Sequence, residues 1–270
     1  MTTADIPAAN PPRPMAPHPV ITKEGKIRRF DVHQIIQHAV LMTSFILLVL
    51  TGLPLKFSDA GISQWWAALW GGIEVLRTTH RVAAWMMISD CVYHIGYLVY
   101  TIGILKRPFP IRIVPNRDDI IQMYQEVAYF IGVRKTRPKV DRFSWKEKFD
   151  YWAIFWGMPV MVGSGFVLMF PVWATKWLPG WIVPTALVAH SHEAMLALVW
   201  IAVVHIFFAH FTPSTFPINT VIFTGKMKRE KYREEHPLEY ERIVQRELGI
   251  VPESPEAAAD ITPEKPEETA

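Results

Sequence analysis

Seven of the ten histidines fall in or at the ends of long apolar segments of the chain. An ionisable side chain inside a membrane segment is costly, and it usually has a function there. Imidazole is also the commonest metal ligand among side chains. Because several such histidines occur together, they predict a shared binding site rather than unrelated hydrogen bonds. The seven are His38, His80, His94, His190, His192, His205 and His210.

The stretch HRVAAWMMISDCVYH, from His80 to His94, has a spacing that would place two ligands on one side of a helix. At about 100° and 1.5 Å per residue, fourteen positions bring both ends within about 40° of one face, about 21 Å apart. His190 and His205, fifteen positions apart, fall within about 60° of one face. His192 lies about 140° out of line with His205 and is the poorer candidate. The spacing therefore predicts His80 opposite His190 at one depth and His94 opposite His205 at another.

Paired histidines at two depths favour haem over other metal centres. Bis-imidazole ligation within a helix bundle suits haem iron, whose potential the ligands and burial tune. Zinc would require four ligands at one level, often including cysteine or carboxylate. The one cysteine, Cys91, excludes a Cys-based iron–sulfur site and covalent haem attachment through C-x-x-C-H. We therefore expect two haems b.

The elements that must position these histidines are apolar blocks of about 20 residues, the length that crosses a bilayer. The blocks cover 38–57, 79–105, 151–173 and 184–211. Apolar residues at helical spacing predict a further, interfacial helix at 117–133. The predicted fold class is therefore all-α, an integral membrane four-helix bundle with a cytoplasmic interfacial helix between the second and third spans.

Composition predicts the division of the chain. Residues 1–25 and 251–270 are rich in proline or glutamate, which predicts disordered tails. Residues 26–225 would form the four-helix membrane domain, and 226–250 a charged cytoplasmic helix.

Lysine and arginine are concentrated on one side of the predicted bundle. Residues 106–148 hold eleven of them, whereas the two loops on the other side carry only Lys56, Arg77 and Lys176. By the positive-inside rule, both termini and the middle loop face the cytoplasm of a multi-pass protein, which we expect in the bacterial inner membrane. This rule accounts for the basic side, so no nucleic-acid partner is inferred; membrane lipid is the expected surrounding.

Three stretches resemble the membrane cytochrome b subunits of respiratory complexes, especially the gamma subunit of formate dehydrogenase and related hydrogenase and thiosulfate reductase cytochromes. The resemblance covers about residues 30–245. It implies His80 and His190 as ligands of an outer haem, and His38 and His205 as ligands of an inner haem. The stretches are HAVLMTSFILLVLTG (38–52), HSHEAMLALVWIAVVHIFFAH (190–210) and GKMKREKYREEHPLEYER (225–242).

Two features depart from the formate dehydrogenase pattern. His94 is absent from that pattern, although the second helix of the cytochrome b of quinol–cytochrome c reductases resembles it here. The fifteen-residue spacing from His190 to His205 is one residue longer than in the dehydrogenase subunit. Both His38 and His94 therefore remain candidates for the inner haem, and a third haem joining His38 to His210 is an alternative.

The resemblance implies a di-haem subunit that transfers electrons across the membrane between a quinone or menaquinone pool and a partner redox subunit. That partner would be an iron–sulfur protein or a multihaem cytochrome c, at the periplasmic side or in the membrane. The chain would be the quinone-reactive subunit of an oxidoreductase complex. Two alternatives are a histidine-based transporter or proton or metal relay, and a haem-free membrane anchor; haem content separates them from the first.

Further candidate residues lie at the ends of the spans. Quinone chemistry moves protons, so titratable groups are expected at the inner surface. Arginines there could bind haem propionates, and a carboxylate beside a ligand could orient its ring. The quinone candidates are Asp31, Glu147, Asp150 and Tyr151; the propionate candidates are Arg28, Arg29 and Arg81; Glu193 could orient a ligand; Asp90 is expected to make a small polar helix contact.

Overall fold

The computed structural model describes residues 21–22, 24–212 and 215–247. Four helices in it are long and apolar enough to cross a membrane, as the apolar blocks predicted. They are α1 (Val32–Lys56), α3 (Ile73–Val99), α5 (Trp145–Met169) and α7 (Ile182–Val199); α3 continues in π-helical form to Ile104, and α7 continues to Phe211.

Three of these helices, α1, α3 and α5, begin several residues before the apolar blocks, and polar caps start two of them, α1 and α5. The Asp31 side chain accepts a hydrogen bond from the backbone N–H of Gln34, and the Gln34 side chain accepts one from the backbone N–H of Asp31. Ser144 and Glu147 form the same pair of hydrogen bonds at the start of α5. Such capping boxes satisfy backbone donors that have no partner within the helix. A search for apolar blocks does not detect these polar first turns.

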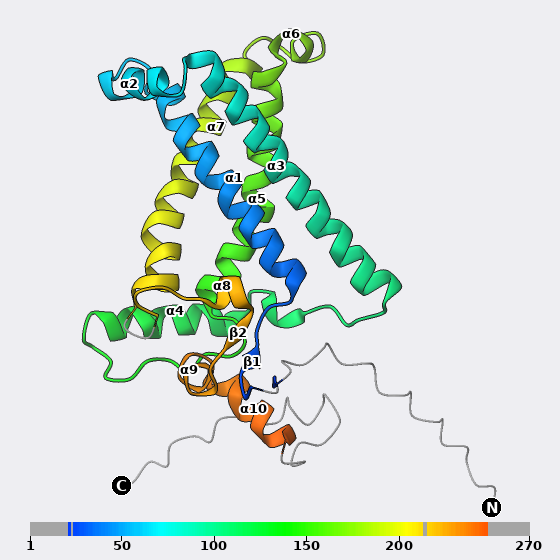
Figure 1. The fold of residues 1–270 in the computed structure, drawn as a ribbon, viewed down its shortest axis with the longest axis vertical. Helices are drawn as coiled ribbons and strands as arrows, with labels where there is room; N and C mark the ends of the chain where they lie inside the picture. The colour runs from blue at the N-terminus through cyan, green and yellow to red at the C-terminus, as the bar shows by residue number, and fades with distance from the viewer. Residues whose placement is uncertain (1–20, 23, 213–214, 248–270) are drawn as a thin grey trace, which may run out of the picture.

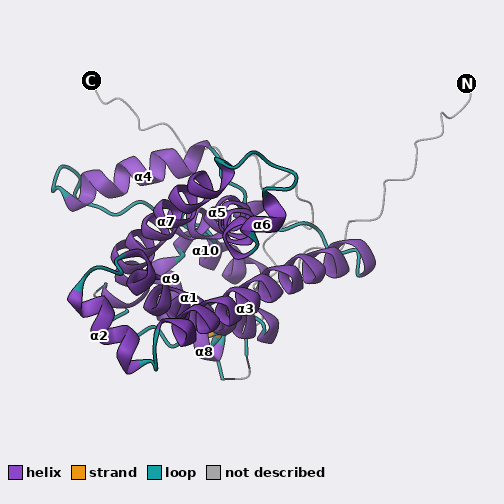
Figure 2. Cartoon of the chain, turned by 90° about the horizontal axis from the view of Figure 1, so that it is seen from above, coloured by secondary structure: helices purple, strands orange, loops and turns teal. Residues whose placement is uncertain are grey.

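The four long helices form two pairs. α1 packs mainly on α3, and α5 packs mainly on α7. Figure 2 shows the bundle from above, with α1 beside α3 on one side and α5 and α7 on the other. The two pairs face each other, so a site between them takes residues from both.

The second half of α7 is π-helical, from Trp200 to His205 and again from Phe207 to Phe211. A π turn closes its hydrogen bond one residue later than an α turn, so it accommodates one extra residue. This turn lies between His190 and His205. With one extra residue accommodated, His190 and His205 are oriented as two histidines fourteen residues apart would be in an uninterrupted α-helix.

Short elements cover the two ends of the bundle (Figure 1). At one end lie α2 (Gly61–Leu69) and α6 (Pro171–Ala174), with exposed tryptophans such as Trp65 and Trp173. At the other end lies α4 (Arg117–Phe130), which confirms the helix predicted at 117–133. Near it are a 3-10 turn (Ile111–Ile113) and α8 (Val221–Thr224).

The segment predicted as one charged helix at 226–250 is divided. Strand β2 (Lys226–Met227) pairs antiparallel with β1 (Ile27–Arg28), and two helices follow, α9 (Arg229–Glu235) and α10 (Pro237–Glu247). The break falls at His236, because a residue before proline is disfavoured in the α conformation. A small core of Ile27, Val221, Met227, Tyr232 and Ile243 joins the segment to the N-terminal strand.

The expected disordered tails lie almost wholly outside the described residues. Of 1–25, residues 21–22 and 24–25 are described, and Ile21 forms a bridge with Ile27. Residues 251–270 are not described.

Candidate functional site

Two pairs of histidine rings face each other across the bundle. His80 of α3 and His190 of α7 have ring centroids 6.3 Å apart, and so do His38 of α1 and His205 in the π-helical part of α7. Imidazoles on opposite sides of one metal ion have centroids about 6 Å apart, because each bound nitrogen lies about 2 Å from the ion. Both pairs therefore have a separation that fits one shared iron.

Hydroxyl groups fix the tautomers of His80 and His190. Thr51 Oγ1 donates to the carbonyl four residues before it at 2.7 Å, and it accepts the Nδ1–H of His80 at 2.8 Å. Ser164 Oγ donates in the same way at 2.5 Å and accepts the Nδ1–H of His190 at 3.0 Å. With the proton on Nδ1, each Nε2 keeps a lone pair that can bind a metal.

A glycine beside each hydroxyl residue gives the imidazole room. A Cβ atom at Gly52 would lie 3.2 Å from Cε1 of His80, and one at Gly165 would lie 3.2 Å from Cε1 of His190. Both contacts are tighter than ordinary van der Waals packing allows. Sequence reasoning did not assign these residues to the histidine site; the signal is a hydroxyl–glycine dipeptide, Thr51-Gly52 and Ser164-Gly165, within each of two apolar blocks.

The fixed partner of His205 is a carboxylate. His205 Nδ1 lies 2.7 Å from Asp150 Oδ2, and Trp200 donates its indole N–H to Asp150 Oδ1 at 2.5 Å. Asp150, singled out in the sequence for the inner surface, therefore holds a histidine in the structure. As for the other pair, Nδ1 donates and Nε2 of His205 remains available to a metal.

His94 faces other partners. Its Nδ1 lies 2.7 Å from Gln37 Oε1, an acceptor, and its Nε2 lies 3.2 Å from the hydroxyl of Tyr151. Both ring nitrogens are thus engaged, and the ring packs edge-on against Tyr151. The histidine ring that faces His205 is that of His38.

His210 and His192 also lie apart from the two ring pairs. His210 Nδ1 accepts the backbone N–H of Asn219 at 3.1 Å, which puts the ring proton on Nε2 of the neutral imidazole. His192 is exposed, and its Nδ1 lies 2.8 Å from the carbonyl of Val188.

The arginines named from the sequence have different surroundings. Arg28 lies exposed in β1, and Arg81 lies exposed on α3, next to His80 in the chain. Arg29 is buried, with hydrogen bonds to Glu147 and His236. These bonds engage Arg29 and Glu147, and they join the N-terminal segment to α5 and to His236, the residue that follows α9.

The Arg29 contact is part of a buried polar network at the α4–α10 end. His236 accepts from Arg29 at Nε2 and donates from Nδ1 to the carbonyl of Asp141 at 2.7 Å, so the ring is neutral. Burial, together with the adjacent Arg29 guanidinium, lowers the pKa of His236 to about 3. Burial and the neighbouring Glu239 carboxylate raise the pKa of Tyr232. The segment after α8 is therefore attached by specific hydrogen bonds as well as by its small core.

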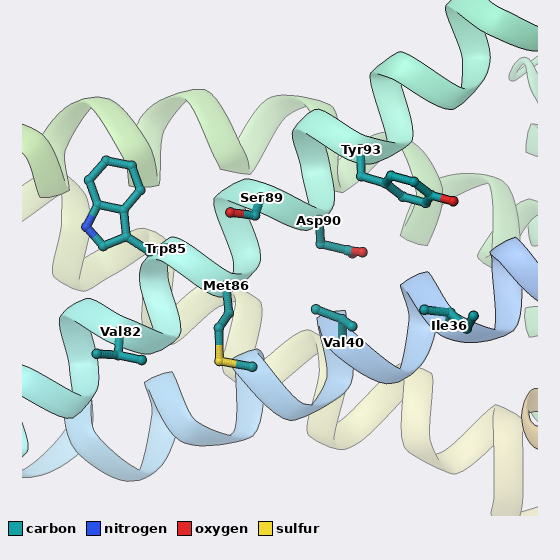
Figure 3. Close-up of a pocket in the computed structure, with 8 residues that line it drawn as sticks. All are labelled: Ile36, Val40, Val82, Trp85, Met86, Ser89, Asp90 and Tyr93. Atoms are coloured by element: carbon teal, nitrogen blue, oxygen red, sulfur yellow. The ribbon is translucent and has the colours of Figure 1, made fainter.

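A groove of about 630 Å³ lies between α1 and α3 (Figure 3). Ile36 and Val40 line it, and two residues along a helix turn by about 200°, which puts His38 on the other side. The Asp90 carboxylate points into the space between the helices, and within the described part of the chain it makes no hydrogen bond or ion pair. The polar helix contact expected for Asp90 is not formed there.

The donor set fits haem better than a protein-only metal site. Within the described residues, no three His, Cys, Asp or Glu side chains gather where they could hold a metal ion. Each pair of facing imidazoles could hold a haem iron, and the haem macrocycle would supply the remaining ligands. The zinc alternative weighed from the sequence therefore lacks the ligands it requires.

Comparison with known proteins identifies the family of the chain. A model of the prokaryotic cytochrome b561 family matches residues 29–216, which include all four long helices and all four paired histidines. No curated protein matches the chain. The chain therefore belongs to the prokaryotic cytochrome b561 family, and it is a multi-pass membrane protein of the kind that binds b-type haem and transfers electrons.

Proposed function

We propose that the chain is a di-haem electron-transfer subunit of a respiratory oxidoreductase complex, joining a quinone pool to a partner redox subunit. The observation that carries the proposal is the two facing imidazole pairs, each with centroids 6.3 Å apart. Haem b, when bound, takes up and releases single electrons. Two such sites along one bundle give a path across the membrane.

The residues proposed as ligands are His80 with His190 and His38 with His205. Three of the four have Nδ1 on a hydroxyl or carboxylate oxygen, which leaves Nε2 for the iron. His94 is not proposed as a ligand, because Gln37 and Tyr151 engage both of its nitrogens. A third haem at His210 is not proposed either, because its Nδ1 accepts a backbone N–H.

We propose the α4–α10 end as the cytoplasmic side of an inner membrane. The concentration of lysine and arginine in residues 106–148 supports this orientation. Exposed tryptophans at the α2–α6 end, Trp65 and Trp177 among them, suit an interfacial belt on the outer side. His38 and His205 would then form the inner pair, and the partner subunit would contact the outer end.

Quinone is proposed to react at the inner end. Titratable groups there include Asp31, which accepts from Tyr97 at 2.8 Å, and Tyr151, which contacts His94. Glu147 is hydrogen-bonded to Arg29, and Asp150 is hydrogen-bonded to His205, so we assign both carboxylates a structural role and not a role in quinone chemistry. A hydroxyl–imidazole pair such as Tyr151 and His94 can pass a proton to a bound oxygen.

The test is haem b per polypeptide in the purified protein, by pyridine haemochrome against quantitative amino-acid analysis. We expect two haems in the unaltered chain, one in His190→Ala, and two in the control His192→Ala. The control removes a histidine two positions away that is exposed and bonded only to its own helix. Absence of haem, or an equal loss in both variants, would contradict the proposal.

A further inference from the structure

The two imidazole pairs differ in what accepts their Nδ1 protons. His80 and His190 donate to the neutral hydroxyls of Thr51 and Ser164, each of which passes its own proton to a backbone carbonyl. His205 instead donates to the carboxylate of Asp150 at 2.7 Å. One pair is therefore held by neutral acceptors, and the other has an anionic acceptor.

Among the residues that the structure describes, no lysine or arginine forms an ion pair with Asp150. Neighbouring basic residues have their own carboxylate partners: Lys146 lies 2.5 Å from Glu126, and Lys148 lies 2.8 Å from Asp119. Asp150 receives only neutral donors, the indole N–H of Trp200 and the ring N–H of His205. In the described part of the chain, the hydrogen bonds of this carboxylate are therefore to Trp200 and His205.

An anionic acceptor draws the Nδ1 proton towards itself and makes Nε2 a more basic ligand. A more basic ligand stabilises the more highly charged, oxidised iron, so hydrogen bonding around a haem ligand changes its reduction potential. A neutral hydroxyl has a smaller effect, because hydrogen bonds to charged groups are about twice as strong as neutral ones.

We propose that Asp150 is a positioning residue that lowers the reduction potential of the iron held by His38 and His205, while the iron held by His80 and His190 lacks this control. The inference rests on the proposed ligand pairs. Trp200 moderates the effect, because its indole N–H shares the negative charge of the carboxylate. Asp150 thus gives the second pair an anionic hydrogen-bond acceptor where the first pair has neutral ones.

The test is a redox titration of the purified holoprotein, followed by the haem absorbance, with haem content measured on each sample. Asp150→Asn should raise one of the two potentials, with at least a tenfold change in the reduction equilibrium, or about 59 mV for one electron. Trp200→Phe should shift the same potential downward, because the carboxylate loses a neutral donor. The other potential should stay unchanged in both variants.

Asp90→Asn is the matched control, since it also removes one carboxylate from a long helix but contacts neither pair. It should leave both potentials unchanged. Two haems with unchanged potentials in Asp150→Asn would overturn this inference alone, as would equal shifts in the Asp90 variant. Loss of one haem in Asp150→Asn would mean a purely structural role and would also overturn it. Fewer than two haems in the unaltered chain would overturn the proposed function and this inference with it.

Discussion

The His80–His190 pair and the His38–His205 pair have the same ring separation but different supports. Thr51-Gly52 on α1 and Ser164-Gly165 on α5 hold the first pair in two equivalent ways. The second pair has Asp150 on one side and lies in the half of the bundle where α7 becomes π-helical. The two pairs thus share a ring separation that would suit a shared iron, and they differ in the groups that accept their Nδ1 protons.

The largest expected effect concerns which histidines belong to the second pair. His38→Ala and His205→Ala should each reduce the haem content from two per chain to one, because the proposed site would lose one of the two imidazoles that hold its haem. His94→Ala and His210→Ala should each retain two, since their ring nitrogens face Gln37, Tyr151 and Asn219. Haem per polypeptide measures this. Loss of a haem in His94→Ala with retention in His38→Ala would reverse the assignment.

The next effect tests whether the close approach of Gly165 to the His190 ring supports the first pair. Gly165→Val should lower the occupancy of the His80–His190 site, because added atoms at 3.2 Å from the His190 ring must displace it, and overpacking costs about 1–3 kcal/mol. Gly163→Val is the control, since nothing lies within 4 Å of a Cβ atom there. The measurement is the haem content of each variant after matched purification. Equal losses in both variants would show that general helix packing, and not the ring contact, is at work.

A smaller effect is a pH dependence of local stability, which is expected at the α4–α10 end of the bundle and not at the α2–α6 end. The pKa of His236 is lowered to about 3 from an ordinary 6.5, so below pH 6.5 the detached segment binds a proton that the attached one does not. The contribution of neutral His236 to the attachment of α9 and α10 is therefore fully present above pH 6.5 and is lost as the pH falls towards 3. The equilibrium constant for attachment should fall by up to about tenfold per pH unit. Amide hydrogen exchange, corrected for its intrinsic pH dependence, should speed up at pH 5.5 in α9 and α10 but not in α2.

The control for this effect is His236→Gln, whose side chain keeps an acceptor and a donor but does not titrate in this range. Exchange in α9 and α10 of that variant should not depend on pH over the same interval. A pH dependence of equal size in the variant would assign the effect to another group of the network.

The smallest expected effect is at the groove between α1 and α3. Asp90→Leu should leave haem content unchanged, because Asp90 contacts neither ring pair and has no hydrogen bond within the described residues. Haem content and the absorbance spectrum of the variant check this. A lost haem would mean that this groove is coupled to one of the pairs.

The sequence by itself determined the four spans, the helix between the second and third spans, and the candidate histidines. Apolar blocks long enough for a bilayer have few other stable structures, and the repeat of the α-helix places His80 and His94, or His190 and His205, near one face. The pairing of His80 with His190 could be predicted in this way, since both lie near the starts of spans that begin on the same side of the membrane. The polar starts of α1 and α5 could not be found by hydropathy, although Asp31–Gln34 and Ser144–Glu147 are readable as capping boxes.

Only the tertiary structure decided which ring faces His205. His38 and His94 lie at similar depths on adjacent helices, and the rotation of each helix, set by packing against its neighbours, turns one towards His205 and the other towards Tyr151. The same holds for Thr51, Ser164 and Asp150, which reach their histidines across helix contacts. It also holds for the junction of Ile27 with Met227, two hundred residues apart in the chain. Periodicity fixes the face of a single helix, whereas contacts between helices depend on packing that no single segment encodes.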